Sequence, residues 1–425
     1  MITPTLLSAT PTLDTGNTAW MTVATILVLL MSIPGIALFY GGLVRQKNVL
    51  SVIMQTMLIV GVVSLLWVAI GYSWAFGTGF RESGSPLWLF MGGTDKAFLH
   101  GITLDSIMPT GIPELTFAMF QCMFALITPA LILGAFAERI KFKGYMVFVV
   151  LWVIIAYFPM AHWVWGGGFL QEMGAIDFAG GTVVHINAGI SALVMCLMIG
   201  NRDDYRKGHA ILPHNVTVVF MGMSFLWLGW FGFNAGSGLA ADGLAANALM
   251  VTHVAAAAAA VTWIAIDWTC NKKPTTVGAC TGAVAGLVAI TPAAGSTDIM
   301  GALAIGIITP VVCFVMVAVV KPYFKYDDAL DAFGVHGMGG IVGSILTGVF
   351  ATHSITGADG AAGALYGDWH QLGIQTVATL ISIVYSAIVT YILYVIVDKT
   401  IGMRVCRRVE EEGLDIYEHG ESAYN

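Results

Sequence analysis

Two histidines lie inside apolar, glycine-rich stretches of the chain. Both His185 and His336 are the second residue of the pattern V-H-x-x-x-G-I. An ionisable residue in apolar surroundings is a candidate for function, and a neutral histidine can both donate and accept hydrogen bonds. The repeated pattern predicts that the two rings have equivalent roles in contact with a small polar molecule. The alternative is two unrelated core histidines whose nitrogens bind backbone groups.

Six further residues could form a site for a small cation. They are Phe120 and Phe124 in one apolar stretch, Trp230, Phe233 and Ser237 in a second, and Trp165 at the end of a third. The spacings within the first two stretches place the side chains on one face of a helix. Aromatic rings attract a small cation, with about 0.5–2 kcal/mol per contact, and a nearby hydroxyl adds a hydrogen bond. An interfacial belt of aromatic residues would show a similar pattern.

The composition indicates that these residues lie in a membrane. Of the 425 residues, 57% are apolar and only 10% are charged, whereas soluble proteins carry about 25% charged residues. A single soluble core cannot bury so much apolar surface, because folded proteins leave much of their surface in water. The apolar stretches are continuous, and the strands of a membrane barrel would instead alternate with a period of two. The chain is therefore predicted to be an all-α polytopic membrane protein.

The number of membrane-crossing helices follows from the length that each one needs. A bilayer core of about 30 Å is crossed by about 20 apolar residues in helical form. On this criterion we predict eleven transmembrane helices, at Thr18–Tyr40, Val49–Phe76, Thr116–Ala137, Tyr145–Trp165, Val183–Ile199, Val216–Ser237, Asn247–Trp268, Val277–Thr291, Ile299–Val320, Val335–Phe350 and Leu372–Val397.

The basic residues predict how the chain is oriented in the membrane. All of them except Arg81 and Lys96 fall in loops that follow odd-numbered spans or in the C-terminal tail. The positive-inside rule then places the N-terminus outside the cell and the C-terminus in the cytoplasm. We expect a transmembrane domain over residues 1–398 and a cytoplasmic tail over residues 399–425.

The two histidine patterns also indicate an internal repeat. They fall in the fifth and tenth predicted spans, and an odd offset of five spans reverses the direction of the second copy across the membrane. Two halves related in this way form an inverted repeat, which many transporters contain. We therefore predict spans one to five and six to ten as the two halves, with the eleventh as an extra helix.

The predicted spans limit the kind of substrate. They contain no Lys or Arg, and a charge near the bilayer centre is costly. A pathway for Na⁺ or K⁺ needs rings of carbonyl groups or charged side chains, so these spans suit a substrate that is neutral or becomes neutral in passage. The sequence shows no metal-ligand spacing and no nucleophile–base pair. We predict no cofactor, no bound metal, no enzymatic activity and no nucleic-acid partner.

Several stretches resemble the ammonium transporter family, which comprises the Amt proteins and is related to the Mep and Rh proteins. The segment from Asp177 to Gly189, DFAGGTVVHINAG, closely resembles the signature of this family. The other matching stretches are IPGIALFYGGLVRQKNVLS from Ile33, GAFAERI from Gly134, AHWVWGGG from Ala161, WFGFNAGS from Trp230, DAFGVHGMGGIVG from Asp331 and the tail EEGLDIYEHGESAYN from Glu411. The resemblance covers nearly all predicted spans and is strongest with the bacterial members.

The resemblance implies a role for each candidate residue. Members of the family form homotrimers in the cytoplasmic membrane, with a separate narrow pore in each protomer. The implied roles are recruitment of ammonium by Phe120, Trp165 and Ser237 with Asp177 nearby, a gate formed by Phe124 and Phe233, and a pore lined by His185, His336 and Trp230. Asp177 is expected to have a structural role or one in deprotonation. The cytoplasmic face is expected to bind a trimeric nitrogen-signalling protein of the P-II class.

Ammonium transport is therefore the expected function. The cation binds outside at the aromatic residues and loses its proton, because an apolar pore makes the charged form too costly. Ammonia then passes the gate and hydrogen-bonds to both neutral histidines, whose rings share a proton that fixes their orientation. The alternatives are a neutral gas channel of the Rh type and an ammonium sensor. The complete aromatic and serine site favours the Amt type, and the short tail leaves no room for the signalling domain that sensors usually carry.

Overall fold

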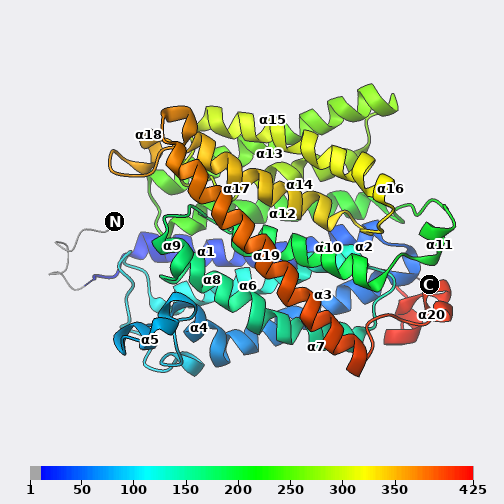
Figure 1. Cartoon of the computed structure of the whole chain (residues 1–425), viewed down its shortest axis with the longest axis horizontal. Helices are drawn as coiled ribbons and strands as arrows, with labels where there is room; N and C mark the ends of the chain where they lie inside the picture. Colours follow the sequence, from blue (N-terminus) through cyan, green and yellow to red (C-terminus); the bar gives the residue numbers. More distant parts are fainter. Residues whose placement is uncertain (1–10, 425) are drawn as a thin grey trace.

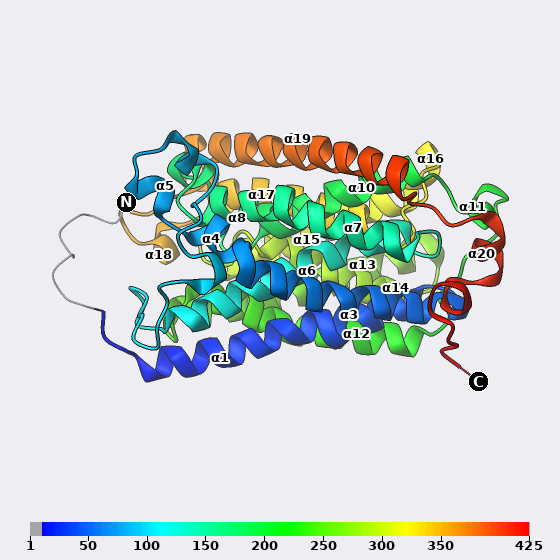
Figure 2. The same ribbon diagram turned by 90° about the horizontal axis from the view of Figure 1, so that it is seen from below.

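The structure is a computed structural model that describes residues 11–424 of the chain (Figure 1). All regular structure in this range is helical, which confirms the prediction of an all-α membrane protein. Figures 1 and 2 show from two sides that the long helices run roughly along one direction. This arrangement suits a bilayer, since a helix satisfies its own backbone N–H and C=O groups.

Ten helices in the described range are long and apolar enough to cross a bilayer. With their segments they are Thr15–Leu43 (α1 Thr15–Leu30 and α2 Ala37–Leu43), Gln46–Glu82 (α3 Val49–Leu66, α4 Tyr72–Phe76 and α5 Gly79–Glu82), Glu114–Phe136 (α6), Phe142–Glu172 (α7 Phe142–Trp152, α8 Phe158–Trp165 and α9 Phe169–Glu172), Gly181–Ile199 (α10 Asn187–Ile199), Val216–Gly238 (α12 Val216–Ala235), Gly243–Asn271 (α13), Ile299–Phe324 (α15 Ile299–Val315 and α16 Lys321–Phe324), Phe333–Phe350 (α17 Met338–Phe350) and Trp369–Thr400 (α19). The shorter helices are α11 (Asp203–Arg206), α14 (Thr276–Ile290), α18 (His353–Thr356) and α20 (Arg407–Glu412).

The predicted spans coincide with these helices, with differences at their ends. Helices α5 and α9 prolong the second and fourth long helices beyond the predicted ends at Phe76 and Trp165, after breaks at Gly77 and Gly166. The predicted eighth span, Val277–Thr291, is α14, which has only 15 residues. Because a straight crossing needs about 20 residues, the total of eleven transmembrane helices stays a prediction.

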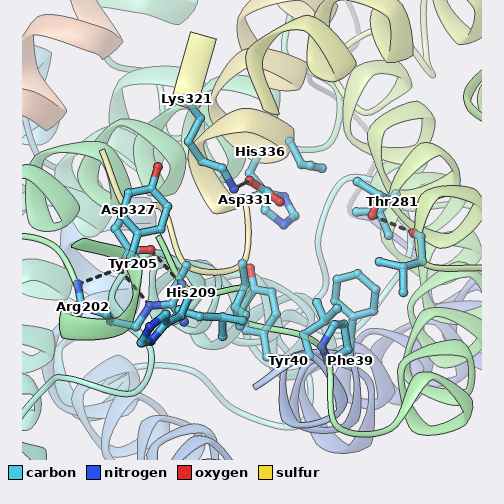
Figure 3. A pocket seen from close by; sticks show the side chains of 18 residues that line it. Phe39, Tyr40, Arg202, Tyr205, His209, Thr281, Lys321, Asp327, Asp331 and His336 are labelled. Carbon is cyan, nitrogen blue, oxygen red and sulfur yellow. Dashed lines mark hydrogen bonds and ion pairs between the residues drawn. The ribbon is translucent and has the colours of Figure 1, made fainter. Parts of the chain in front are cut away.

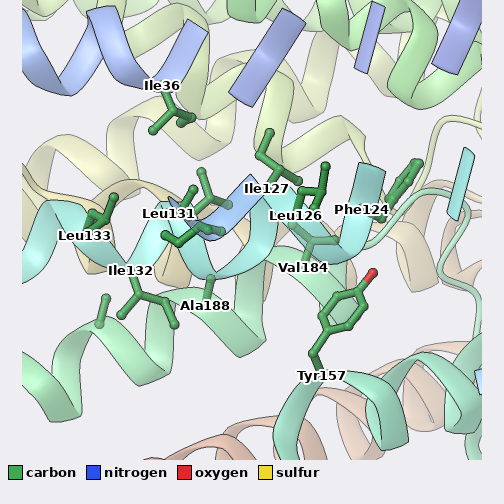
Figure 4. Close-up of a cluster of buried hydrophobic side chains, with 14 of the residues drawn as sticks. Ile36, Phe124, Leu126, Ile127, Leu131, Ile132, Leu133, Tyr157, Val184 and Ala188 are labelled. Carbon is green, nitrogen blue, oxygen red and sulfur yellow. The ribbon is translucent and has the colours of Figure 1, made fainter. Parts of the chain in front are cut away.

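Helix α6 lies in the middle of the bundle and carries two of the candidate residues. In its most apolar stretch of 18 residues, 89% of the residues are buried. The helix has apolar residues on all faces, as expected of a helix enclosed by others. It packs against α1, α3 and α10. Figure 4 shows its side chains, Phe124 among them, between Ile36 of the first long helix and Val184 and Ala188 of the fifth.

The two ends of the bundle differ in the segments that cover them. Helices α5, α9 and α18 lie at one end, and α11 and α20 lie at the opposite end (Figures 1 and 2). The chain after α19 folds onto this second end. There Glu410 accepts a hydrogen bond from the N–H of Asp203 at 2.7 Å, and Asp415 accepts from the N–H of Ser51 at 2.8 Å. The tail therefore ties together the loops of that end.

Candidate substrate pathway

A depression of about 610 Å³ lies at the end of the bundle that carries α5 and α9. We call it the aromatic depression, since its lining includes Tyr72, Phe76, Phe117, Phe124, Trp165 and Phe178, together with Ser237. Three of the predicted site residues, Phe124, Trp165 and Ser237, thus meet here. Phe120 is fully buried behind Phe124, with the ring centroids 5.0 Å apart. It backs the Phe124 ring, whereas we expected it to face the substrate.

Trp165 and Ser237 are each held by a hydrogen bond to the backbone. Trp165 is the last residue of α8, and its Nε1–H donates to the carbonyl of Asp177 at 2.8 Å. Ser237 lies one turn beyond Phe233, and its hydroxyl donates to the carbonyl of Phe233 at 2.8 Å. Since its proton is used in this way, the oxygen of Ser237 keeps its lone pairs for accepting hydrogen bonds. The site can therefore offer a cation both a ring face and an acceptor.

Phe124 and Phe233 close the inner side of the aromatic depression. Their rings are stacked at a centroid distance of 4.2 Å and an interplanar angle of 24°. Both side chains are buried, and the Phe124 and Trp165 rings form a T-shaped pair with a centroid distance of 5.7 Å. Two stacked phenyl rings leave no polar group for an ion to bind. The structure therefore brings the two predicted gate residues together in an apolar contact.

The two histidines follow directly behind this gate. The ring of His185 lies 6.1 Å from that of Phe233, and it is stacked on His336 and on Trp230, at 5.4 Å in each case. Trp230 is held by a 2.8 Å hydrogen bond from its Nε1–H to the hydroxyl of Thr291. Neither ring nitrogen of His185 has a hydrogen-bond partner in residues 11–424, so the structure contains no His185–His336 hydrogen bond, and the expected shared proton stays a prediction.

The ring nitrogens of the histidines are therefore available to a third molecule. Both nitrogens of His185 and Nδ1 of His336 are buried without a hydrogen-bond partner in residues 11–424. Buried polar groups are nearly always paired, so unpaired ones indicate a place for water or a small ligand. This contradicts the alternative of two core histidines satisfied by backbone groups.

His336 lines a second cavity, of about 380 Å³, which we call the charged cavity. Figure 3 shows Lys321, Asp331 and His336 close together on one wall, and Lys321 and Asp331 form an ion pair. Arg202 and Tyr205 of the opposite end of the bundle also line it. No three His, Cys, Asp or Glu side chains of the described chain are grouped to hold a metal ion. The charged cavity is thus a polar mouth on the far side of the histidines.

Asp177 supports the segment that carries His185. Its buried carboxylate accepts hydrogen bonds from the N–H groups of Gly180, Gly181 and Thr182 at 2.8, 2.6 and 2.7 Å, and it also accepts from the Thr182 hydroxyl. Burial raises the pKa of the Asp177 carboxyl, and these hydrogen bonds oppose the shift. A carboxylate at this place satisfies the free N–H groups that begin a helix. Asp177 is therefore a positioning residue beneath the aromatic depression rather than part of its lining.

Asp328 supports the segment that carries His336 in the way that Asp177 supports that of His185. Asp328 was not among the site residues predicted from the sequence. Its carboxylate accepts hydrogen bonds from the N–H groups of Ala332 and Phe333 at 3.0 and 2.8 Å. Burial, and then the charge of Asp331, raise the pKa of Asp328 to about 6. In both copies of the predicted repeat the aspartate stands eight residues before the histidine. This shared spacing was the signal that could have found it, and it supports the inverted repeat.

Buried ion pairs fasten the loops around the charged cavity. Arg202 pairs with Asp327 at 2.7 Å and with Glu138 at 2.9 Å, and Glu138 also pairs with Arg45 at 2.8 Å. Burial opposes the ionisation of Glu138, but Arg202 and Arg45 outweigh it and lower the pKa of its carboxyl. Arg139 donates to the carbonyl of Asp327 at 2.6 Å. These ion pairs and hydrogen bonds link four loops beside the charged cavity.

Comparison with known proteins agrees with this arrangement. The chain matches the model of the Ammonium Transporter Family over residues 19–424. It is 49% identical to an ammonium transporter of Aquifex aeolicus over 414 residues, which are 97% of this chain and 94% of that protein. It is similar to the crystal structure of Mep2 from Saccharomyces cerevisiae, with a TM-score of 0.85 and 37% identity over 93% of this chain and 88% of that one. It is also similar to a structure described as a sensor Amt protein, with a TM-score of 0.86 and 30% identity over 95% and 98% of the two chains. These matches place it among transport proteins rather than enzymes, and the chain belongs to the ammonium transporter family.

Proposed function

We propose that this transporter binds ammonium in the aromatic depression, removes its proton and passes ammonia along the histidines to the charged cavity. The observation that carries the proposal is a continuous series of rings between the two cavities. Trp165 and Phe124 line the first cavity, Phe233 and His185 follow, and His336 lines the second. The centroids of successive rings in this series are no more than 6.1 Å apart.

Recruitment uses the two kinds of group that the aromatic depression offers. The rings of Trp165 and Phe124 attract a cation through their faces, and the Ser237 oxygen accepts one of its N–H groups. Ammonium has four N–H donors, so it uses the acceptor and the rings together. An alkali cation has no N–H to donate, and its contact with a neutral hydroxyl replaces little of its hydration.

Loss of the proton, which passes to water in the aromatic depression, follows from what lies beyond Phe124. The stacked phenyl rings and the buried histidines provide no counter-charge, and moving an ion into such a place costs much more than moving a neutral molecule. Ammonia has one lone pair and three N–H groups. A neutral histidine offers one donor and one acceptor, so the unpaired nitrogens of His185 and His336 replace the lost hydration of ammonia. K⁺ has no proton to lose and is excluded at this point.

The setting in the cell is a further part of the proposal. We place the aromatic depression outside, the charged cavity and residues 399–425 in the cytoplasm, and the protein in the cytoplasmic membrane as a homotrimer whose outer surface contacts lipid. The distribution of Lys and Arg supports this orientation. The docked tail and the charged cavity form the face on which a P-II signalling protein would sit. Co-elution of the purified transporter with the P-II protein of the same organism, across nucleotide and 2-oxoglutarate conditions, tests that partner. Absence of a complex under every condition would remove it.

Ammonium sensing is the second candidate, because the chain is similar over 95% of its length to a sensor Amt protein. Uptake of radioactive methylammonium by proteoliposomes separates the two functions. A transporter gives saturable uptake that exceeds that of empty liposomes, and excess ammonium suppresses it. Uptake equal to that of empty liposomes would favour a sensor. A current on an ammonium pulse would in addition exclude a neutral gas channel of the Rh type.

A further inference from the structure

Two basic side chains line the aromatic depression, and their surroundings differ. Arg81 and Lys96 are the two basic residues predicted to lie on the outer side of the membrane, opposite to all other Lys and Arg residues. Both line this cavity. The guanidinium of Arg81 lies 5.3 Å from the ring centroid of Trp88 and has no carboxylate partner among residues 11–424. The ammonium group of Lys96, by contrast, forms an ion pair with Glu114.

The ion pair of Lys96 has the composition of a cation site. Glu114 Oε1 also accepts a 2.8 Å hydrogen bond from the hydroxyl of Tyr72, and Lys96 Nζ lies 5.8 Å from the Tyr72 ring centroid. Tyr72 is fully buried, and Phe117 packs against its ring with a centroid distance of 6.3 Å. The side chain of Glu114 is only 12% exposed. A carboxylate beside a fixed aromatic ring provides the two attractions that hold small monovalent cations.

The occupant of this site is chemically close to the substrate. The head group of Lys96 is a primary ammonium, which differs from the ammonium ion by one bond to carbon. Its backbone is held separately, since the N–H of Lys96 donates to the hydroxyl of Ser73 at 2.9 Å. The side chain can therefore leave the site without movement of the loop. Because the head group is tethered, its effective concentration is of the order of millimolar or higher, and dissolved cations at lower concentrations do not displace it.

We propose that Glu114 and Tyr72 form a monovalent-cation site at the rim of the aromatic depression, and that Lys96 occupies it as a tethered plug against K⁺ and other alkali cations. An unpaired carboxylate here would attract every monovalent cation to the entrance. K⁺ and ammonium would then compete for this carboxylate, so the capture of ammonium at the entrance would depend on the K⁺ concentration. Lys96 thus adds selectivity at the entrance, before the gate. The effect on transport rests on the proposed function, whereas the existence of the site does not.

The test removes the plug and measures cation binding directly. Purified Lys96→Met protein is compared with wild type for binding of radioactive Rb⁺, which stands in for K⁺. The variant should bind Rb⁺ with about threefold to tenfold higher affinity, the range for one partly buried charge pair. Lys96→Met combined with Glu114→Gln should return to the wild-type level. Arg81→Met is the matched control, because it removes the same charge from the same cavity without freeing a carboxylate. Lys96→Gln serves as a second variant if Lys96→Met does not fold.

Transport then gives an independent readout. Methylammonium uptake by the Lys96→Met protein should require about threefold to tenfold more substrate for half-saturation with excess K⁺ than without it, whereas uptake by wild type should not depend on K⁺. Equal Rb⁺ affinity of wild type and of the folded Lys96 variants would refute the proposed cation site. The same increase in Rb⁺ affinity in the Arg81→Met control would also refute it. Failure of wild-type protein to take up methylammonium would refute the proposed function while the Rb⁺ measurement still decides the site.

Discussion

Replacement of Asp177 by asparagine removes one carboxylate oxygen with almost no change of shape. Oδ1 accepts from the N–H groups of Gly180 and Gly181, and Oδ2 accepts from the N–H and the hydroxyl of Thr182 and from the N–H of Val183 at 3.2 Å. An amide nitrogen cannot accept, so at least two hydrogen bonds are lost in either orientation of the asparagine. A hydrogen bond to a charged group contributes about 1.5–3 kcal/mol. The free energy of unfolding should therefore fall by about 3–6 kcal/mol.

Transport should fall together with stability in this variant, because the same N–H groups begin the segment that carries His185. The free energy of unfolding can be measured by denaturation in mixed micelles, and transport by methylammonium uptake into proteoliposomes. Asp242→Asn is the matched control, since exposed Asp242 caps α13 through one hydrogen bond of 3.0 Å and asparagine caps a helix equally well. An Asp177→Asn protein as stable as this control, yet unable to transport, would refute the positioning role. It would make Asp177 a proton acceptor instead.

Three further perturbations have defined outcomes. Trp165→Leu removes one ring face worth about 1 kcal/mol, so the half-saturating methylammonium concentration should rise about fivefold with an unchanged maximal rate; an unchanged concentration dependence would contradict recruitment at this residue. Phe233→Ala removes half of the 4.2 Å stack with Phe124, so water should enter, and light scattering during osmotic shrinkage of proteoliposomes should show faster water flow than in wild type; equal flow would count against a gate. Burial opposes the ionisation of Asp327, but Arg202 outweighs it and lowers the pKa of this carboxyl from 3.8 to about 2. The resulting stability, about 2 kcal/mol, is complete above pH ~4 and is lost as the pH falls through ~2; Asp327→Asn should lose less stability over this acid range, and an identical acid loss would contradict the ion pair.

The helices and the rings of the pathway could be predicted from the sequence because residue type and spacing determine both. Long apolar stretches specify membrane helices, and the spacing of Phe120 and Phe124 specifies a shared helix face. The same spacing does not say which of the two rings faces the substrate. That depends on the neighbouring helices, and the structure places Phe124 at the depression with Phe120 behind it.

Features that depend on loops and on side-chain rotation could not be predicted in this way. The pairing of Lys96 with Glu114 depends on the path of a loop without periodic pattern. The stacking of His185 between Trp230 and His336 depends on ring orientation, for which the sequence offers no signal. Asp328 is different, since its distance from His336 repeats that of Asp177 from His185 and is readable once the repeat is extended backwards.

The pair of histidines provides the most direct test of the central claim. His185→Ala and His336→Ala proteins should be reconstituted, and the uptake of methylammonium and of Rb⁺ measured on the same proteoliposomes. His253→Ala is the control, because His253 lies exposed on the outside of α13, away from both cavities. If the unpaired nitrogens of the two rings carry ammonia, each pathway variant should lose methylammonium uptake or admit Rb⁺, and the control should do neither. Wild-type methylammonium uptake and continued exclusion of Rb⁺ in both pathway variants would contradict the account.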